Sequence, residues 1–295
     1  MKNNAIAEDK TVYFGLYRMS PDDVESEFPK GYLNTVSVSA DACADYLRRM
    51  KGFCGKVWIG VWDKVVSWSS PDLLQEKWRE NLIAAVKALE EQNVLDGVLG
   101  FYFDEPLLNR MPKETYRILT KFMRETWPSL RVFTVFAVNA VDPTVWSTGN
   151  DQVLDPETLR YTTDAGYDMY HDARGDGILP YKKLNASLKK RFGRDDFRVW
   201  YVPCIMNYWG NKDEAYALAH TEAMYGFLKE EKNPGGLLCY AWDISNHDGE
   251  IGNIGLSELL ARDKDPWTAL YGRVQKIGRE ILGCGGGGTR RTGTL

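Results

Sequence analysis

The chain has 295 residues, of which 44% are hydrophobic, and a formal net charge of −4 at pH 7. This length allows two small domains or one (β/α)₈ barrel, since such barrels often take roughly 250 residues. Acids and bases are interspersed, so the sequence lacks the basic surface that a nucleic acid or an anionic membrane would require. No apolar run approaches the ~20 residues of a membrane-spanning helix. We therefore expect neither a nucleic-acid partner nor a membrane span.

The cysteines and the two ends of the chain bear on its location and boundaries. Five cysteines are present and none forms a CxxC pair, which argues against a disulfide framework and a structural zinc site. The first ten residues lack the apolar segment of a signal peptide, so the protein is expected to be either cytoplasmic or the mature form of a secreted protein. We expect residues 1–10 to form an N-terminal extension, 11–283 the catalytic domain, and the glycine-rich residues 284–295 a disordered tail.

Short segments rich in β-branched and aromatic residues recur along the chain, each bounded by turn residues or acids. They predict eight strands, at residues 11–17, 32–38, 56–62, 98–103, 131–137, 167–170, 198–205 and 236–242. Amphipathic helices are predicted between the strands. One of these helices is predicted to begin at the cap formed by residues 70–72, with the sequence Ser-Pro-Asp. Its apolar face would consist of Leu74, Trp78, Leu82, Val86 and Leu89.

The alternation of strands and helices predicts βαβ units and a parallel sheet. Eight such units without a charged or proline-rich linker favour a single closed (β/α)₈ TIM barrel. The alternative is a doubly wound open sheet, in which a glycine-rich phosphate-binding loop commonly follows the first strand. Residues 15–23 read GLYRMSPDD at that position and match no glycine-rich nucleotide-binding pattern. No cofactor is expected.

Acids and aromatic residues dominate the predicted strand ends. In a (β/α)₈ barrel the loops after the strands form one mouth, where the chemistry takes place. Aromatic rings can stack on the apolar faces of sugar rings, while carboxylates and amides hydrogen-bond to sugar hydroxyls. A carbohydrate is therefore the expected substrate. The residues expected to bind it are Arg18, Trp62, Asp63, Tyr170, Asp172, Asn207, Trp209, Trp242 and Asp243.

Other catalytic groups have less support in the sequence. The three histidines, His171, His220 and His247, form no HxH or HExxH pair, so the ligand sets of common catalytic metal sites are missing. No GxSxG motif is present, and no cysteine ends a predicted strand beside an evident base. We predict no metal site, and carboxylates remain as the catalytic groups.

The segment VLGFYFDEP, residues 98–106, places two adjacent acids at the end of an apolar strand. Two partly enclosed carboxyl groups repel each other, which raises the pKa of one of them. Glu105 would thereby hold a proton near neutral pH and act as general acid/base. Asp104 would stay ionised and stabilise positive charge in the transition state of glycoside cleavage. The alternative is a solvated loop start or a helix N-cap, where acids are also favourable.

The commonest barrel glycosidases carry the acid/base Glu after the fourth strand and a nucleophilic Glu after the seventh, but the seventh predicted strand here contains no acid. The pair Asp104-Glu105 instead resembles β-N-acetylhexosaminidases and spherulin-4-like glycosidases acting on galactosamine-containing polymers. This resemblance covers the segment DGVLGFYFDEP and the inferred barrel. It implies substrate-assisted hydrolysis of a 2-acetamido sugar. Asp104 would polarise the acetamido group, Glu105 would be the acid/base, and Tyr170 would hydrogen-bond to that group.

The expected function is hydrolysis of a polysaccharide or glycan, because several aromatic residues at the mouth indicate more than one sugar subsite. Two alternatives remain open. One is a carbohydrate-binding barrel without catalysis, in keeping with the missing acid on the seventh strand. The other is an isomerase or lyase that uses Glu105 as its base. The sequence leaves open the sugar and linkage, the stereochemical outcome, the second catalytic carboxylate, endo or exo action, and the oligomeric state.

Overall fold

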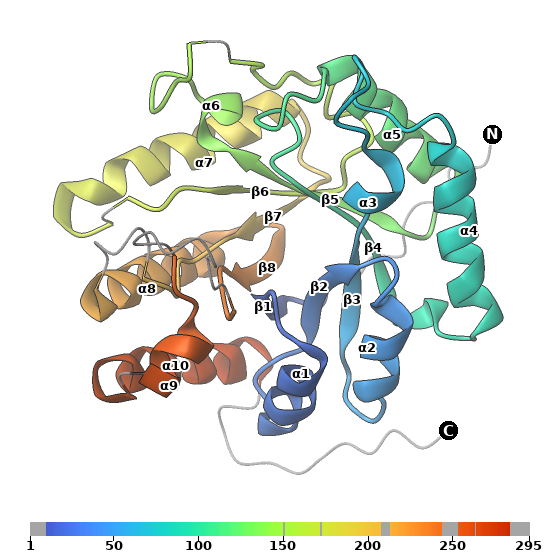
Figure 1. Ribbon diagram of the computed structural model, residues 1–295. Helices are drawn as coiled ribbons and strands as arrows, with labels where there is room; N and C mark the ends of the chain where they lie inside the picture. Colours follow the sequence, from blue (N-terminus) through green and yellow to red (C-terminus); the bar gives the residue numbers. More distant parts are fainter. Residues whose placement is uncertain are drawn as a thin grey trace.

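The computed structural model describes residues 10–149, 151–171, 173–207, 213–243, 253–262 and 264–283, the side chains of 264–266 excepted. Eight parallel strands form a closed barrel in which each strand pairs with its neighbour in chain order, and the eighth pairs with the first. Helices surround the barrel on the outside (Figure 1). The chain is therefore a single (β/α)₈ TIM barrel, and the predicted fold class is confirmed.

The strands are short and the helices between them vary in length. The strands are β1 (Tyr13–Tyr17), β2 (Thr35–Ser39), β3 (Lys56–Gly60), β4 (Val98–Asp104), β5 (Arg131–Ala137), β6 (Asp164–Asp168), β7 (Arg198–Tyr201) and β8 (Pro234–Cys239). The helices are α1 (Pro21–Glu27), α2 (Cys43–Arg49), α3 (Trp62–Val65), α4 (Trp78–Glu91), α5 (Lys113–Thr126), α6 (Val138–Val141), α7 (Leu179–Phe192), α8 (Glu214–Glu230), α9 (Leu256–Arg262) and α10 (Lys264–Ile281). Single 3₁₀ turns lie at Phe28–Lys30, Leu95–Gly97 and Gly175–Ile178.

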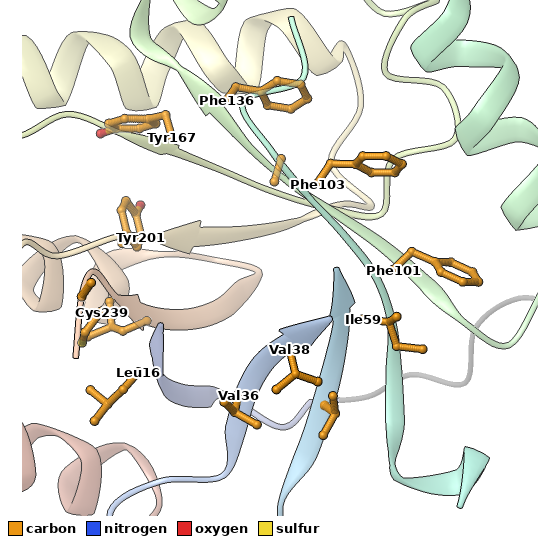
Figure 2. Packing of buried hydrophobic residues seen from close by; sticks show 14 of the residues in the cluster. Leu16, Val36, Val38, Ile59, Phe101, Phe103, Phe136, Tyr167, Tyr201 and Cys239 are labelled. Carbon is orange, nitrogen blue, oxygen red and sulfur yellow. The ribbon is translucent and has the colours of Figure 1, made fainter. Parts of the chain in front are cut away.

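The core has two layers, because successive residues of a strand point to opposite faces of the sheet. The outer layer lies between the strands and the helices. Figure 2 shows part of it, with the labelled residues Leu16, Val36, Val38, Ile59, Phe101, Phe103, Phe136, Tyr167, Tyr201 and Cys239. The inner layer fills the barrel with Tyr13, Trp58, Leu99, Tyr102, Phe133, Val135, Trp200, Val202 and Leu238. The rings of Phe133 and Trp200 stack with centroids 4.6 Å apart, so the barrel interior is a packed core.

A buried ion pair ties this core together at the end of the barrel where the strands begin. Arg131 starts β5 and Asp164 starts β6, and Arg131 Nε lies 2.7 Å from Asp164 Oδ2. The indole N–H of Trp200 donates to the other carboxylate oxygen at 2.9 Å. Both oxygens of a fully buried carboxylate are thus satisfied, which is the condition for such a pair to be tolerated.

Replacing Asp164 by Ala should destabilise the fold by about 3–5 kcal/mol, because Arg131 and the indole N–H of Trp200 would stay buried without their acceptor. The measurement is urea-induced unfolding followed by circular dichroism. Asp196, which pairs with Arg194 at the surface and is 77% exposed, is the matched control. Asp196→Ala should change the free energy of unfolding by about 1 kcal/mol or less. Equal effects of the two substitutions would contradict the prediction.

The helix predicted to begin at residues 70–72 starts later, at Trp78, so that part of the prediction was wrong. Asp72 Oδ1 accepts a hydrogen bond from the N–H of Leu74, which forms a local turn in place of a helix cap. Leu73 has a φ of 58°, a left-handed conformation that no helix contains. The predicted apolar face from Trp78 onward is buried as expected: Trp78, Leu82, Val86 and Leu89.

Residues 1–9 of the expected N-terminal extension (1–10) and the whole expected tail (284–295) lie outside the described residues, so both segments stay predictions. Within the described part of the chain, every helix is too short or too polar to cross a membrane.

Candidate active site

A cavity of about 450 Å³ opens at the carboxyl ends of the strands. This is the end of a (β/α)₈ barrel at which active sites form. Its lining includes three acids from two strand ends: Asp104 and Glu105 at the end of β4, and Asp168 at the end of β6. Four tyrosines contribute to the same wall: Tyr17, Tyr102, Tyr170 and Tyr240.

Asp104 is fixed by two tyrosine hydroxyls. Tyr102 lies two residues earlier on the same face of β4 and donates to Asp104 Oδ1 at 2.9 Å. Tyr17, at the end of β1, donates to Oδ2 at 3.1 Å. Burial raises the pKa of Asp104, while these two hydrogen bonds and the positive charge of Arg18 oppose that rise. The carboxyl group is thus held in one orientation with a spare lone pair on each oxygen.

The backbone at Glu105 explains how two adjacent acids reach one cavity. In a regular strand the side chain after Asp104 would point outward, toward the helices. Glu105 instead has a φ of 44°, in the left-handed region, which costs a non-glycine residue roughly 1–2 kcal/mol. Its N–H donates to the carbonyl of Val135 at 2.8 Å, so the turn is anchored to β5. Strained backbone of this kind clusters at functional sites.

Glu105 can hold a proton at neutral pH. Burial and the neighbouring charge of Asp104 raise the pKa of Glu105 to about 7, and a hydrogen bond from Asp168 partly opposes the rise. A carboxyl group whose pKa lies near the working pH is suited to donate a proton and then to accept one. Perturbation by burial and a charged neighbour inside a cavity is typical of catalytic groups.

Asp168 lines the cavity and was not among the predicted site residues. Its carboxyl group is hydrogen-bonded to that of Glu105, and burial together with the charges of Glu105 and Asp104 raises the pKa of Asp168 well above its usual range. Its Oδ1 is buried and has no hydrogen-bond partner among the described residues. The predicted sixth strand ended at Tyr170, whereas β6 ends at Asp168. The acid in the segment GYDMY was the available signal, at a strand end two residues earlier than expected.

Several residues predicted to bind substrate lie at this mouth. Tyr170 lines the catalytic cavity, and its ring stacks on Tyr240 with centroids 5.6 Å apart and planes at 10°. Arg18, Trp62 and Asp63 line a second cavity of about 450 Å³. Their role in binding stays a prediction.

The other predicted binding residues lie elsewhere or cannot be placed. Trp242 is 4% exposed and its ring packs against Tyr271, so it belongs to the core rather than to either cavity wall. Asn207 pairs with Ile254 through backbone hydrogen bonds, and Asp243 is exposed on the surface; neither lines either cavity. Asp172 and Trp209 lie outside the described residues.

The described residues include no candidate metal site. In the ranges that the structure describes, no three His, Cys, Asp or Glu side chains are grouped so that they could hold a metal ion. His171 lines the catalytic cavity. His220 is buried, and its Nδ1 accepts a hydrogen bond from the N–H of Cys204 at 3.0 Å, which indicates a structural role.

Comparisons with known proteins give a fold and no family. No model of a known protein family matches the sequence, and no curated protein matches it. An intracellular xylanase from Thermoanaerobacterium saccharolyticum has a similar structure, with a TM-score of 0.55 and 9% identity over 83% of this chain and 90% of the xylanase. A β-galactosidase from Rahnella sp. R3 gives a TM-score of 0.58 and 11% identity over 94% of this chain and 57% of that chain.

An exo-β-1,4-mannosidase from an Opitutaceae bacterium, strain TAV5, also has a similar structure, with a TM-score of 0.58 and 14% identity over 92% of this chain. The chain spans 60% of the length of that mannosidase. Identities this low establish a shared architecture and leave the chemistry to the site itself. The architecture that this chain shares is the TIM barrel found in these glycoside hydrolases.

Proposed function

We propose that this chain is a glycoside hydrolase in which Glu105 is the general acid/base and Asp104 is its electrostatic partner. One observation carries the proposal: the left-handed backbone of Glu105, directly after β4, allows two adjacent carboxyl groups to point into the same tyrosine-lined cavity at the barrel mouth. Within it, Asp104 is oriented by two hydroxyl donors, and Glu105 has a pKa of about 7. The glycosidases with the same architecture support this proposal by analogy.

The chemistry follows from the two different environments. Protonated Glu105 delivers its proton to the glycosidic oxygen as the bond to the anomeric carbon breaks. Positive charge then develops on the sugar ring, and the fixed carboxylate of Asp104 stabilises it. Ionised Glu105 afterwards removes a proton from the water that attacks the anomeric carbon. Asp168, hydrogen-bonded to Glu105, holds the acid/base in position.

The substrate itself would supply the nucleophile. Among the described residues the acids of the cavity wall are Asp104, Glu105 and Asp168. Asp168 is hydrogen-bonded to Glu105, which is closer than the roughly 5–5.5 Å that separates the acid and the nucleophile of a retaining pair. The strand β7 carries no acid. We therefore favour a 2-acetamido sugar, whose acetamido oxygen attacks the anomeric carbon as the glycosidic bond breaks, while Asp104 accepts a hydrogen bond from the acetamido N–H. The water that Glu105 deprotonates then displaces this oxygen from the anomeric carbon, which restores the acetamido group.

Activity should depend on pH in a way that Glu105 determines. The general acid must be protonated, so kcat/KM should be highest below pH 7 and fall about tenfold per unit above a midpoint of about 7. At low pH activity should fall again, because Asp104 must be ionised and burial raises the pKa of Asp104 above its usual value. A pH profile between 4 and 9 on an aryl glycoside checks both limbs. An activity that stays level up to pH 9 would exclude Glu105 as the proton donor.

An activity screen tests the proposed function directly. The purified chain is incubated with aryl glycosides of 2-acetamido and plain hexoses and with chitin, xylan and mannan oligosaccharides, and products are resolved by chromatography. New reducing ends would support hydrolysis. Sugar binding without turnover would instead indicate a carbohydrate-binding barrel. A changed sugar without cleavage by water would indicate an isomerase or lyase that uses Glu105 as its base.

A further inference from the structure

A second cavity lies directly beside the catalytic one. The two cavities share Tyr17 and Tyr102, so these two rings form the wall between them. The hydroxyls of the same two tyrosines hold Asp104. The rings meet edge to face with centroids 5.9 Å apart, which gives the wall a fixed shape. A ligand long enough to pass this wall would contact both cavities.

The second cavity has an aromatic platform at its side. Trp62 follows β3 and lines the cavity, and its ring stacks on that of Trp68, with centroids 5.9 Å apart and planes at 12°. The rings of Trp62 and the buried Phe103 meet edge to face, with centroids 6.2 Å apart. Trp68 is 68% exposed, an unusual position for the largest apolar ring. Exposed aromatic surface beside a cavity is typical of ligand-binding sites.

The loop that carries Trp68 is held in place. Val66 and Leu74 form an isolated β-bridge across it, and the side-chain amide of Gln75 donates to the carbonyls of Asp63 and Val66 at 2.9 Å each. These contacts occupy the segment in which a helix was predicted. The platform is therefore positioned by structure already present without a ligand, which lowers the entropy cost of binding.

A few polar residues lie among the apolar residues that line the rest of the cavity. Ser37 and Ser39 come from β2, and Asp63, whose carboxylate Oδ2 lies 3.2 Å from Lys64 Nζ, comes from the start of α3. Arg18 has a φ of 60°, and its guanidinium lies 6.0 Å from the centroid of the Tyr17 ring. It forms no ion pair with the residues that the structure describes. Hydroxyl, carboxylate and guanidinium groups next to a flat aromatic face match the alternating hydroxyls and apolar face of a sugar.

We propose that this cavity is a second sugar-binding subsite, with Trp62 and Trp68 as its stacking platform. The inference rests on the proposed function in so far as the ligand is a carbohydrate. The substrate is then an oligosaccharide or polysaccharide whose consecutive sugars lie on both sides of the wall formed by Tyr17 and Tyr102. One sugar occupies the cavity of Glu105, and its neighbour in the chain stacks on Trp62.

Binding measured against ligand length tests this subsite. Glu105→Gln is used as the non-hydrolysing background, and oligosaccharides of one to four residues from chitin, xylan and mannan are titrated by isothermal calorimetry. In at least one series, affinity should rise about tenfold or more from the first sugar to the second, the gain expected for one stacked ring. Trp62→Ala should reduce that gain to about twofold or less, and Trp68→Ala should also reduce it.

The matched control is Phe53→Ala. Phe53 is 39% exposed and precedes β3, so it lies at the opposite end of the barrel from Trp62. This variant should keep the full length-dependent gain. Trp62→Phe preserves an aromatic ring and should keep most of it, which separates loss of stacking from loss of folding.

The outcomes for the subsite and for catalysis are distinct. Affinity that does not rise with length in any series, no binding at all, or a gain that Trp62→Ala leaves intact would overturn the subsite. A gain that depends on Trp62, without turnover by the unmodified chain, would uphold the subsite and reject hydrolysis. Turnover without any effect of Trp62 on the gain would uphold hydrolysis and reject the subsite.

Discussion

Glu105→Gln should lower turnover of a natural glycan by about 10²–10⁴-fold, the loss expected when a general acid is removed. Glutamine keeps the shape and a hydrogen-bonding head group but has no proton to deliver. Asp168 would remain within hydrogen-bonding distance of the side chain at position 105. The cavity should therefore keep its geometry, and the substrate should bind with unchanged affinity. The measurements are kcat and KM on the best substrate of the activity screen, together with calorimetric binding of that substrate.

The leaving group provides an internal test of this assignment. Fluoride leaves without full protonation, so a glycosyl fluoride of the same sugar should lose far less rate in Glu105→Gln than the glycan does. Glu114→Gln is the matched control, since Glu114 lies in the first turn of α5 with a side chain 62% exposed. That variant should retain the activity of the unmodified chain. If Glu105→Gln turned over the glycan at an undiminished rate, the acids after β4 would have only a local structural role.

The barrel could be predicted because its signals are local. Each strand is a short β-rich run, and the alternation with amphipathic helices fixes parallel pairing in chain order. The predicted fifth strand, residues 131–137, coincides with β5. Asp104 could be placed at the mouth for the same reason, because it ends the apolar run of β4. The packing of eight strands into one closed sheet then brings their ends together.

Asp168 could not be placed from the sequence because the end of β6 is decided by its neighbours. The run around Tyr167 and Tyr170 is apolar on both sides of the aspartate, so the sequence alone favours a later strand. Pairing with β5 aligns Tyr167 with Phe136 and Asp168 with Ala137, and the strand ends there. Asp168 consequently lines the same cavity as Asp104 and Glu105. This alignment is a tertiary constraint that no single segment encodes.

Two backbone features also escaped prediction. Adjacent side chains on a strand point in opposite directions, so the sequence gives no reason for Glu105 to share a cavity with Asp104. The left-handed turn at Glu105 resolves this. Trp68 is not predicted as a binding residue, because residues 70–72 shortly after it predict a helix cap. The local turn at Asp72 instead leaves an irregular loop in which the ring of Trp68 is exposed to solvent.

Asp104→Asn should lower turnover of a 2-acetamido glycoside by about 10²–10³-fold, the usual loss when an electrostatic stabiliser of the transition state is removed. Plain hexosides should lose less, because Asp104 would stabilise only the charge on their ring and they have no acetamido group to orient. The amide is neutral, and its NH₂ group would meet a donor hydroxyl of Tyr17 or Tyr102, where the carboxylate had accepted on both sides. The comparison is kcat/KM on the two classes of aryl glycoside at pH 5.

The same variant should also change the pH profile, which distinguishes loss of the Asp104 charge from a general loss of folding. The charge of Asp104 contributes to raising the pKa of Glu105 to about 7, so removing that charge lowers the pKa of Glu105. The fall in activity at high pH should therefore have its midpoint at a lower pH in Asp104→Asn than in the unmodified chain. Tyr17→Phe is the control, since it removes one donor to Asp104 but keeps the charge, and its midpoint should stay near that of the unmodified chain. Equal losses on both sugar classes would reject the substrate-assisted route, and a midpoint that stays in place would show that Glu105 is not the titrating acid.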